Sequence, residues 1–128
     1  MTSPAAAASC QTAKPHISVD KESNGKYAWN LYHKGDLLLT SGYKFPNMGV
    51  AASEAGTLIH MVANTLFTLK GERHVYGYRL SLRNTSHHQE IASNGEWGER
   101  DYLDKYEFLV HRAFHLIRTS GVTIDINP

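Results

Sequence analysis

The stretch that decides the fold is HISVDKESNGKYAWNLYHKGDLLLTSG, which runs from His16 to Gly42. Apolar and polar side chains alternate in it with a period of two, as in strands that bury one face. The dipeptide at 24–25 is Asn-Gly, which tolerates the positive φ of a tight hairpin turn, and Lys-Gly at 34–35 supplies a second turn. The stretch therefore predicts three antiparallel strands joined by two short hairpins.

A helical period follows these strands. After Pro46, apolar side chains recur at intervals of three and four residues, which marks one face of a helix. The positions are Ala55, Leu58, Ile59, Val62, Leu66 and Leu69. We expect this helix to continue to Leu69 and to end before Gly71, so that the first segment has the order βββα.

The second segment echoes the first. The pattern Tyr-x-Trp-x-Leu at 27–31 returns as Tyr-x-Tyr-x-Leu at 76–80, 49 residues later. The helical pattern Leu-Ile-His at 58–60 returns as Leu-Val-His at 109–111, 51 residues later, and a two-residue insertion in a polar loop accounts for the difference. We interpret this as a tandem duplication, with repeat 1 at about 16–69 and repeat 2 at about 74–118.

The second repeat is predicted to hold two strands and a helix. One strand covers 75–82 with Tyr76 on its buried face, and a short strand covers 90–93 after a polar loop. Asp101 is the expected N-cap of the helix. The apolar face of this helix is Tyr102, Tyr106, Leu109, Val110, Ala113 and Ile117. After Leu69 the sequence leaves little room for a first strand.

The chain ends in GVTIDINP, at 121–128. Alternation at 122–126 predicts a strand that completes a sheet, and the strand at 17–19 is a candidate neighbour. Residues 1–14, rich in Ala, Ser and Thr, are predicted to form a disordered tail. The fold class is therefore α+β: residues 15–128 form one domain in which an antiparallel sheet packs against two amphipathic helices.

The first repeat resembles the YegP-like family of small bacterial proteins. The similarity rests on the Asn-Gly turn, the aromatic-x-Trp-x-Leu strand at 27–31, the turn at Gly35 and the apolar strand at 37–41, which closes on Thr-Ser. It extends over roughly 17–66 and is weaker over 75–117. The resemblance implies tandem βββα units. It brings no catalytic residues.

Composition limits the classes of function. The chain has 128 residues, is 41% hydrophobic and 20% charged, and carries a net charge of +1 with neutral histidines. Such a charge gives no global field toward nucleic acid or membrane surfaces. Cys10 is the single cysteine, so the fold needs no oxidising compartment. No apolar run approaches the roughly 20 residues that span a bilayer, and we expect a cytoplasmic protein.

A small basic and polar patch is a candidate nucleic-acid site. We predict that its side chains lie on strand faces opposite the buried aromatics, where nucleic acid would need basic groups beside exposed rings. The candidate residues are Asn30, Tyr32, Lys34, Arg79 and Arg83. Acidic residues at 20, 22 and 36 dilute the charge of this face, so ordinary solvated strand faces are the alternative interpretation.

Two histidines form a candidate metal site. His111 and His115 are four residues apart on the second predicted helix, so both rings could reach one ion. The motif HRAFH lacks the glutamate of an HExxH site, and no cysteine joins it. The alternative is that both side chains flank the buried stripe and are solvated.

The sequence contains no motif of a catalytic site. We find no phosphate-binding Gly-rich loop, no nucleophile elbow and no cysteine within the predicted fold. We therefore expect no enzyme and no cofactor. The favoured function is a non-catalytic protein-interaction or structural module, because edge strands of small sheets invite pairing with a partner or a second copy.

Overall fold

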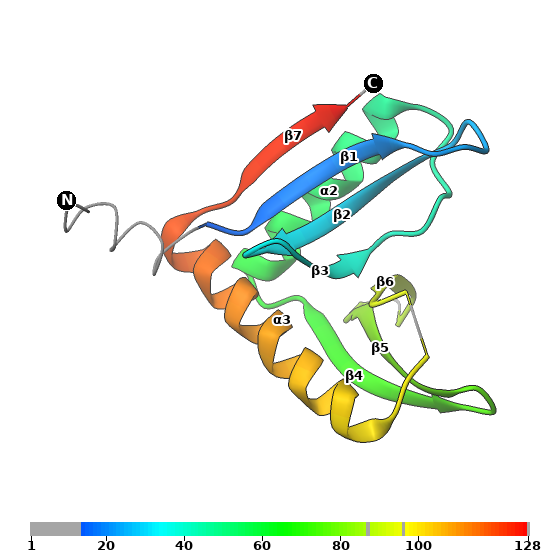
Figure 1. Ribbon diagram of the computed structural model, residues 1–128. Helices are drawn as coiled ribbons and strands as arrows, with labels where there is room; N and C mark the ends of the chain where they lie inside the picture. Colours follow the sequence, from blue (N-terminus) through cyan, green and yellow to red (C-terminus); the bar gives the residue numbers. More distant parts are fainter. Residues whose placement is uncertain (1–13, 87, 96, 128) are drawn as a thin grey trace, which may run out of the picture.

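The protein has an α+β fold, with one seven-stranded sheet and two helices in the residues that the structure describes (Figure 1). The computed structural model describes residues 14–86, 88–95 and 97–127. In chain order the elements are β1 (His16–Lys21), β2 (Tyr27–His33), β3 (Asp36–Thr40), α2 (Met48–Ala63), β4 (Phe67–His74), β5 (Gly77–Asn84), β6 (Glu90–Ser93), α3 (Arg100–Ser120) and β7 (Thr123–Asn127). Across the sheet their order is β4-β5-β6-β3-β2-β1-β7. The predicted tail at 1–14 lies outside the described residues, apart from Lys14.

The three predicted strands of the first segment are confirmed. β1 pairs antiparallel with β2, and β2 pairs antiparallel with β3, with a register shift between Leu31 and Tyr32. Gly25 and Gly35 have φ of 81° and 82°. An L side chain rarely adopts such angles, which explains why glycine ends both turns.

The terminal strand is also confirmed, beside the strand at 17–19. β7 pairs with β1 in parallel, and Ile124 and Ile126 lie opposite Ile17 and Val19. The connection from α3 to β7 is short, with Gly121 at a φ of 90°. β7 therefore forms one edge of the sheet, and β4 forms the other.

Two predictions about the junction between the segments are wrong. The first helix does not continue to Leu69, and the second segment does have a first strand. α2 ends at Ala63, and β4 occupies residues assigned to the helix. Leu66 and Leu69 continue the helical period of the preceding residues. Phe67 and Leu69 fit the two-residue period of a strand equally well, so the pattern alone does not distinguish helix from strand. Eight antiparallel residue pairs join β4 to β5, and Thr65, with a φ of 54°, breaks the helix before it.

Two smaller expectations are corrected. Tyr76 belongs to the two-residue turn between β4 and β5 and is 73% exposed, because His74 already pairs with Gly77. The N-cap of α3 is Glu99, without a side-chain cap, and Asp101 lies in the first turn. There its carboxylate still complements the helix dipole.

A single row of paired residues runs across all seven strands. Thr40 of β3 pairs with Ser93 of β6 and so joins the two halves of the sheet. From β7 to β4 the row reads Asp125, Ser18, Asn30, Thr40, Ser93, Ser81 and Lys70. Directly paired residues lie on the same face of a sheet. We call this polar side the open face, because α2 and α3 pack on the opposite side.

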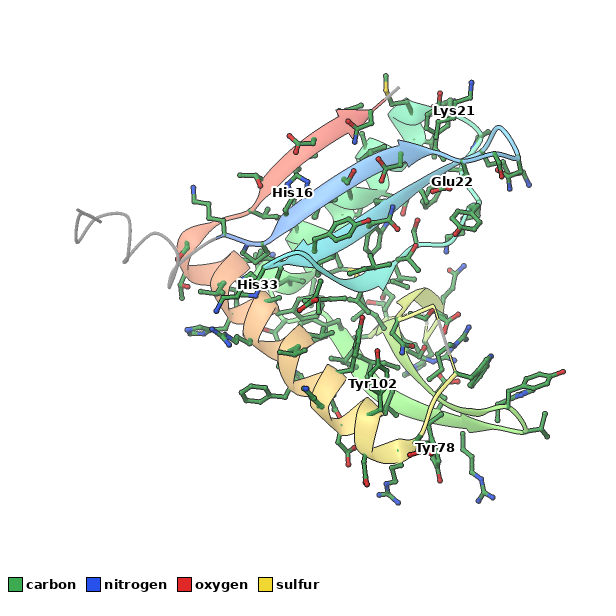
Figure 2. All side chains as sticks on the ribbon, in the orientation of Figure 1. His16, Lys21, Glu22, His33, Tyr78 and Tyr102 are labelled. Atoms are coloured by element: carbon green, nitrogen blue, oxygen red, sulfur yellow. The ribbon has the colours of Figure 1, made fainter. Side chains whose placement is uncertain are left out.

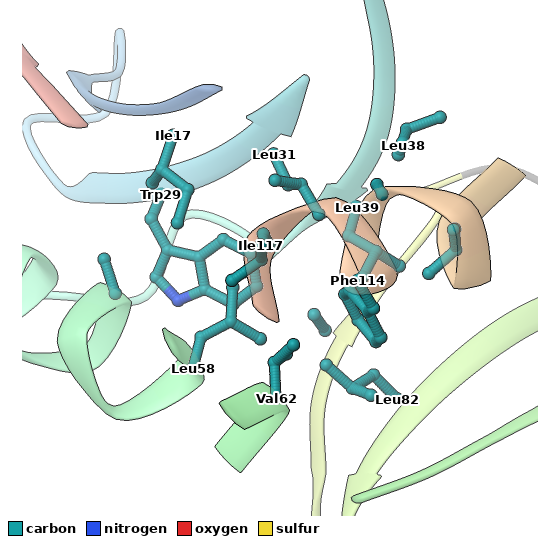
Figure 3. Close-up of a cluster of buried hydrophobic side chains, with 14 of the residues drawn as sticks. Ile17, Trp29, Leu31, Leu38, Leu39, Leu58, Val62, Leu82, Phe114 and Ile117 are labelled. Carbon is teal, nitrogen blue, oxygen red and sulfur yellow. The ribbon is translucent and has the colours of Figure 1, made fainter. Parts of the chain in front are cut away.

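The core lies between the other face of the sheet and the two helices (Figure 3). Trp29 of β2 lies beside Leu58 of α2, while Leu82 of β5 lies beside Phe114 of α3. Trp29 and Phe114 are fully buried. Neither helix of the described residues has the length and apolar character needed to cross a membrane.

Candidate functional site: the open face of the sheet

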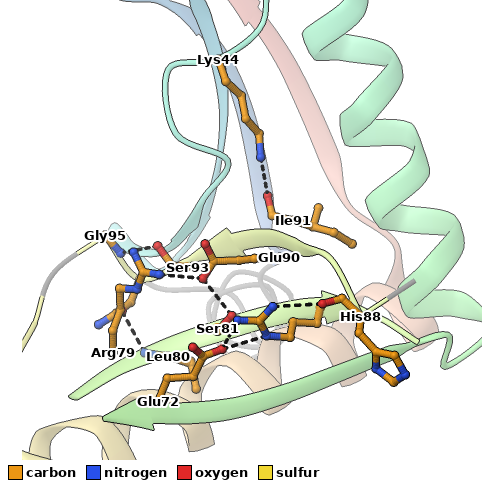
Figure 4. Close-up of polar contacts among 12 residues, drawn as sticks. Lys44, Glu72, Arg79, Leu80, Ser81, His88, Glu90, Ile91, Ser93 and Gly95 are labelled. Carbon is orange, nitrogen blue, oxygen red and sulfur yellow. Dashed lines mark hydrogen bonds and ion pairs between the residues drawn. The ribbon is translucent and has the colours of Figure 1, made fainter. Parts of the chain in front are cut away.

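A network of charged side chains occupies the open face of β4, β5 and β6 (Figure 4). Arg79 donates to Glu90 at 2.8 Å, and Ser81 donates to the same carboxylate at 2.8 Å. Arg83 donates through Nε to Glu72 at 2.8 Å and through a terminal nitrogen as well. Both arginines are therefore already paired with carboxylates from neighbouring strands.

The neighbours of Glu72 favour its charged form. Partial burial raises the pKa of this carboxyl, but hydrogen bonding to Arg83 and Ser81 and the positive charges of Arg83 and Lys70 outweigh burial and leave the pKa below its usual 4.5. A carboxyl with a lowered pKa contributes stability above its unfolded-state pKa, and that stability disappears as the pH falls through the folded-state pKa.

We therefore predict a pH-dependent effect of Glu72→Gln. At pH 7 the variant should lose about 1 kcal/mol of unfolding free energy, because two nitrogens of Arg83 donate to one oxygen of Glu72 and these hydrogen bonds lose the negative charge of their acceptor. The loss should shrink as the pH falls below 4.5, where the wild-type carboxyl also becomes neutral. Urea unfolding at several pH values measures this difference. Asp104→Asn, on exposed α3 surface, is the control, and an equal loss at pH 7 and pH 3 would contradict the prediction.

An aromatic patch lies beside this network, and we define it as His74, Tyr76 and Trp97. The ring of His74 stacks on Tyr76, with centroids 5.0 Å apart, and lies 4.9 Å from the ring of Trp97. The guanidinium carbon of Arg79 lies 4.7 Å from the centroid of the Trp97 ring, a cation–π contact. Val75, next to the patch, is 87% exposed.

The five residues of the predicted basic patch do not come together. Arg79 and Arg83 lie on β5, while Asn30 and Tyr32 lie on β2, with β6 and β3 between them. Three strand spacings separate the two groups by roughly 14 Å. Lys34 is exposed in the turn after β2. They share the open face but do not form one site.

Acidic groups surround the β2 part of the open face. The carboxylate of Asp20 accepts hydrogen bonds from Ser18, Asn30 and Asn127, at 2.8–3.0 Å. Tyr32 lines a hollow of about 360 Å³ together with Asp20 and Glu22. Partial burial, followed by the negative charges of Asp20 and Glu22, raises the pKa of Tyr32. This environment disfavours phosphate.

His111 and His115 lie exposed on α3. His111 Nε2 is 3.8 Å from the carboxylate of Glu107, one turn earlier. In the described part of the chain, no group of three potential metal ligands comes together. Metal binding by this pair stays a prediction, and a zinc titration would test it.

Sequence reasoning missed the aromatic patch. Tyr76 was assigned to a buried strand, and neither His74 nor Trp97 was considered as a site residue. A tryptophan within the polar segment NGEWGER was the available signal, because so large an apolar ring needs a surface to cover.

Solved structures share this fold. No family model matches the sequence, and no curated protein matches it. The chain is similar to the solution structure of yegP from E. coli, a protein of unknown function, with a TM-score of 0.61 and 15% identity over 89% of this chain and 93% of that one. It is also similar to the UPF0339 protein SO3888 from Shewanella oneidensis, with a TM-score of 0.60 and 16% identity over 88% of this chain and 92% of that one. The predicted resemblance is confirmed at the level of the fold.

Proposed function

We propose that the protein is a small, non-catalytic protein-interaction module of the YegP-like kind that contacts its partner through the aromatic patch on the open face. The observation that carries this proposal is the aromatic patch beside arginines whose charge is already balanced. Aromatic residues and arginine are enriched at protein–protein contacts and dominate their binding energy. A cytoplasmic bacterial location goes with this proposal.

The proposal includes a tandem duplication, which matched backbone contacts support. Ser41 Oγ accepts from the Trp29 N–H at 3.0 Å, and Asn94 Oδ1 accepts from the Leu80 N–H at 3.1 Å. Isolated bridges join residues 27 and 45 in the first half and residues 78 and 98 in the second. By these contacts Tyr27 corresponds to Tyr78, 51 residues later, which is also the spacing of the two helical motifs. The sequence echo of 27–31 at 76–80 is therefore displaced by two residues from the structural correspondence and needs no insertion to match the helices.

A substitution of Tyr76 in the aromatic patch tests the proposed contact surface. Tyr76→Ala removes a ring that is 73% exposed in a turn, so we expect the unfolding free energy to change by less than about 0.5 kcal/mol. The wild-type protein in an extract of its own cells should elute from a sizing column earlier than a 14.3 kDa chain. Tyr76→Ala should move most of it to the position of the free chain.

Phe108→Ala is the matched control. Phe108 is 66% exposed on α3, an element that packs on the other side of the sheet. This variant should keep the early elution of the wild type. Identical elution of all three proteins would refute the aromatic patch as the contact surface.

Nucleic-acid binding is the second candidate. It is favoured by the stacking of Arg79 on Trp97 beside the exposed ring of Tyr76, since bases stack on such rings. It is disfavoured by the carboxylate partners of Arg79 and Arg83. An NMR titration with mixed short oligonucleotides at two salt concentrations separates the candidates, because phosphate contacts weaken as salt rises.

A further inference from the structure

The two edges of the sheet differ in how they are protected. β4 carries the exposed charged side chains of Lys70 and Arg73, and lysine on an edge strand discourages pairing with another chain. β7 instead carries Ile124 and Ile126, which are 43% and 47% exposed, and all five of its residues are exposed. The β7 edge is therefore the one suited to further pairing.

The backbone of β7 offers regular hydrogen-bonding groups along this edge. The N–H of Thr123 donates to the carbonyl of Pro15 at 3.1 Å, so residue 123 faces β1. Alternate residues of a strand point their N–H and C=O groups in opposite directions, so Asp125 and Asn127 also face β1. The backbone N–H and C=O groups of Ile124 and Ile126 point away from the sheet. The free edge of β7 therefore offers two hydrogen-bond donors and two acceptors.

The residue between Ile124 and Ile126 is charged. Asp125 belongs to the row across the open face, and its side chain is 64% exposed. His16 lies on β1 beside β7 (Figure 2), and its Nε2 is 3.1 Å from the Asp125 carboxylate. An added antiparallel strand would place its own residue opposite Asp125 in a non-hydrogen-bonded pair, where side chains approach most closely.

This charge selects against a second copy of the chain. If two β7 strands paired over their full length, each Asp125 would lie directly opposite the other, and like charges in that position are destabilising. A shift of two residues avoids this clash but reduces the paired stretch of each β7 strand from five residues to three. A partner with a basic residue at the central position has neither disadvantage.

We infer that the β7 edge binds an extended segment of a partner protein as an eighth, antiparallel strand, with lysine or arginine opposite Asp125 and β-branched residues opposite Ile124 and Ile126. The inference rests on the proposed function and names its mode of binding. In this mode main-chain hydrogen bonds provide affinity and alternate side chains provide specificity.

The test is an NMR titration of the full chain with two capped five-residue peptides. One peptide is threonine, valine, lysine, valine and threonine, and the other has glutamate in place of lysine. We expect the amides of Ile124 and Ile126 to shift, with affinity for the lysine peptide about fivefold higher, as cross-strand charge pairs allow. In Asp125→Lys the preference should reverse.

Several outcomes would overturn the inference. They are equal shifts with both peptides, shifts confined to other elements, the absence of shifts at millimolar peptide, or an unchanged preference in Asp125→Lys. Concentration-dependent shifts of β7 without peptide would mean that a second copy occupies the edge. Because Tyr76 lies in the turn of the β4–β5 hairpin, at the other end of the sheet, Tyr76→Ala should leave peptide binding unchanged (Figure 1). The two proposals can therefore fail separately.

Discussion

Replacing Trp29 with alanine is expected to lower the unfolding free energy by about 3–5 kcal/mol. The indole is fully buried between β2 and α2, where it meets Ile17, Leu58 and Ile117 (Figure 3). Alanine would leave a cavity that the rigid sheet cannot close, and the lost contacts add to the lost burial of apolar surface. Urea unfolding monitored by far-UV circular dichroism measures the change.

Trp29→Phe is the informative comparison. The Nε1 of Trp29 is buried, and no acceptor among the described residues reaches it. Phenylalanine removes this unsatisfied donor while keeping most of the ring volume, so it should cost clearly less than alanine. A loss below about 1 kcal/mol for Trp29→Ala would contradict the packing described here.

Phe114→Ala should have an effect of similar size. Phe114 is fully buried on α3, and its ring meets Phe67 of β4 edge-on, with centroids 4.9 Å apart. We expect a loss of about 3–5 kcal/mol, because the cavity opens where α3 covers the second half of the sheet. The measurement is again urea unfolding.

The same helix supplies the control. Phe108 has the same side chain but is 66% exposed, so Phe108→Ala should change the unfolding free energy by less than about 0.5 kcal/mol. Equal losses for the two phenylalanines would mean that α3 does not pack through the face that carries Phe114.

Local patterns predicted most of the elements. The alternation and glycine turns of 16–42 define three strands without help from distant residues, and the terminal strand was equally clear. The end of α2 could not be predicted in this way, because 66–69 fits both a helical and a strand period. Only pairing with β5, a contact formed between segments, selects the strand.

The candidate site was harder to predict than the fold. That Arg79 and Arg83 point to the open face follows from alternation along one strand, but their partners Glu90 and Glu72 come from two other strands. Both partners depend on the register between strands, which local patterns do not specify. The strand of Glu90 was predicted without its register, and the strand of Glu72 was not predicted. The same applies to Trp97, which reaches Arg79 only because the chain returns beside β5 at residue 98.

The most direct test of the proposed function is site-specific photo-crosslinking in the native cell. A benzophenone side chain at position 76 lies on the aromatic patch, and the same side chain at position 108 provides an equally exposed reference on α3. We predict a discrete protein adduct from position 76 that is absent from position 108. No adduct at 76, or the same adducts from both positions, would contradict the aromatic patch as the contact surface.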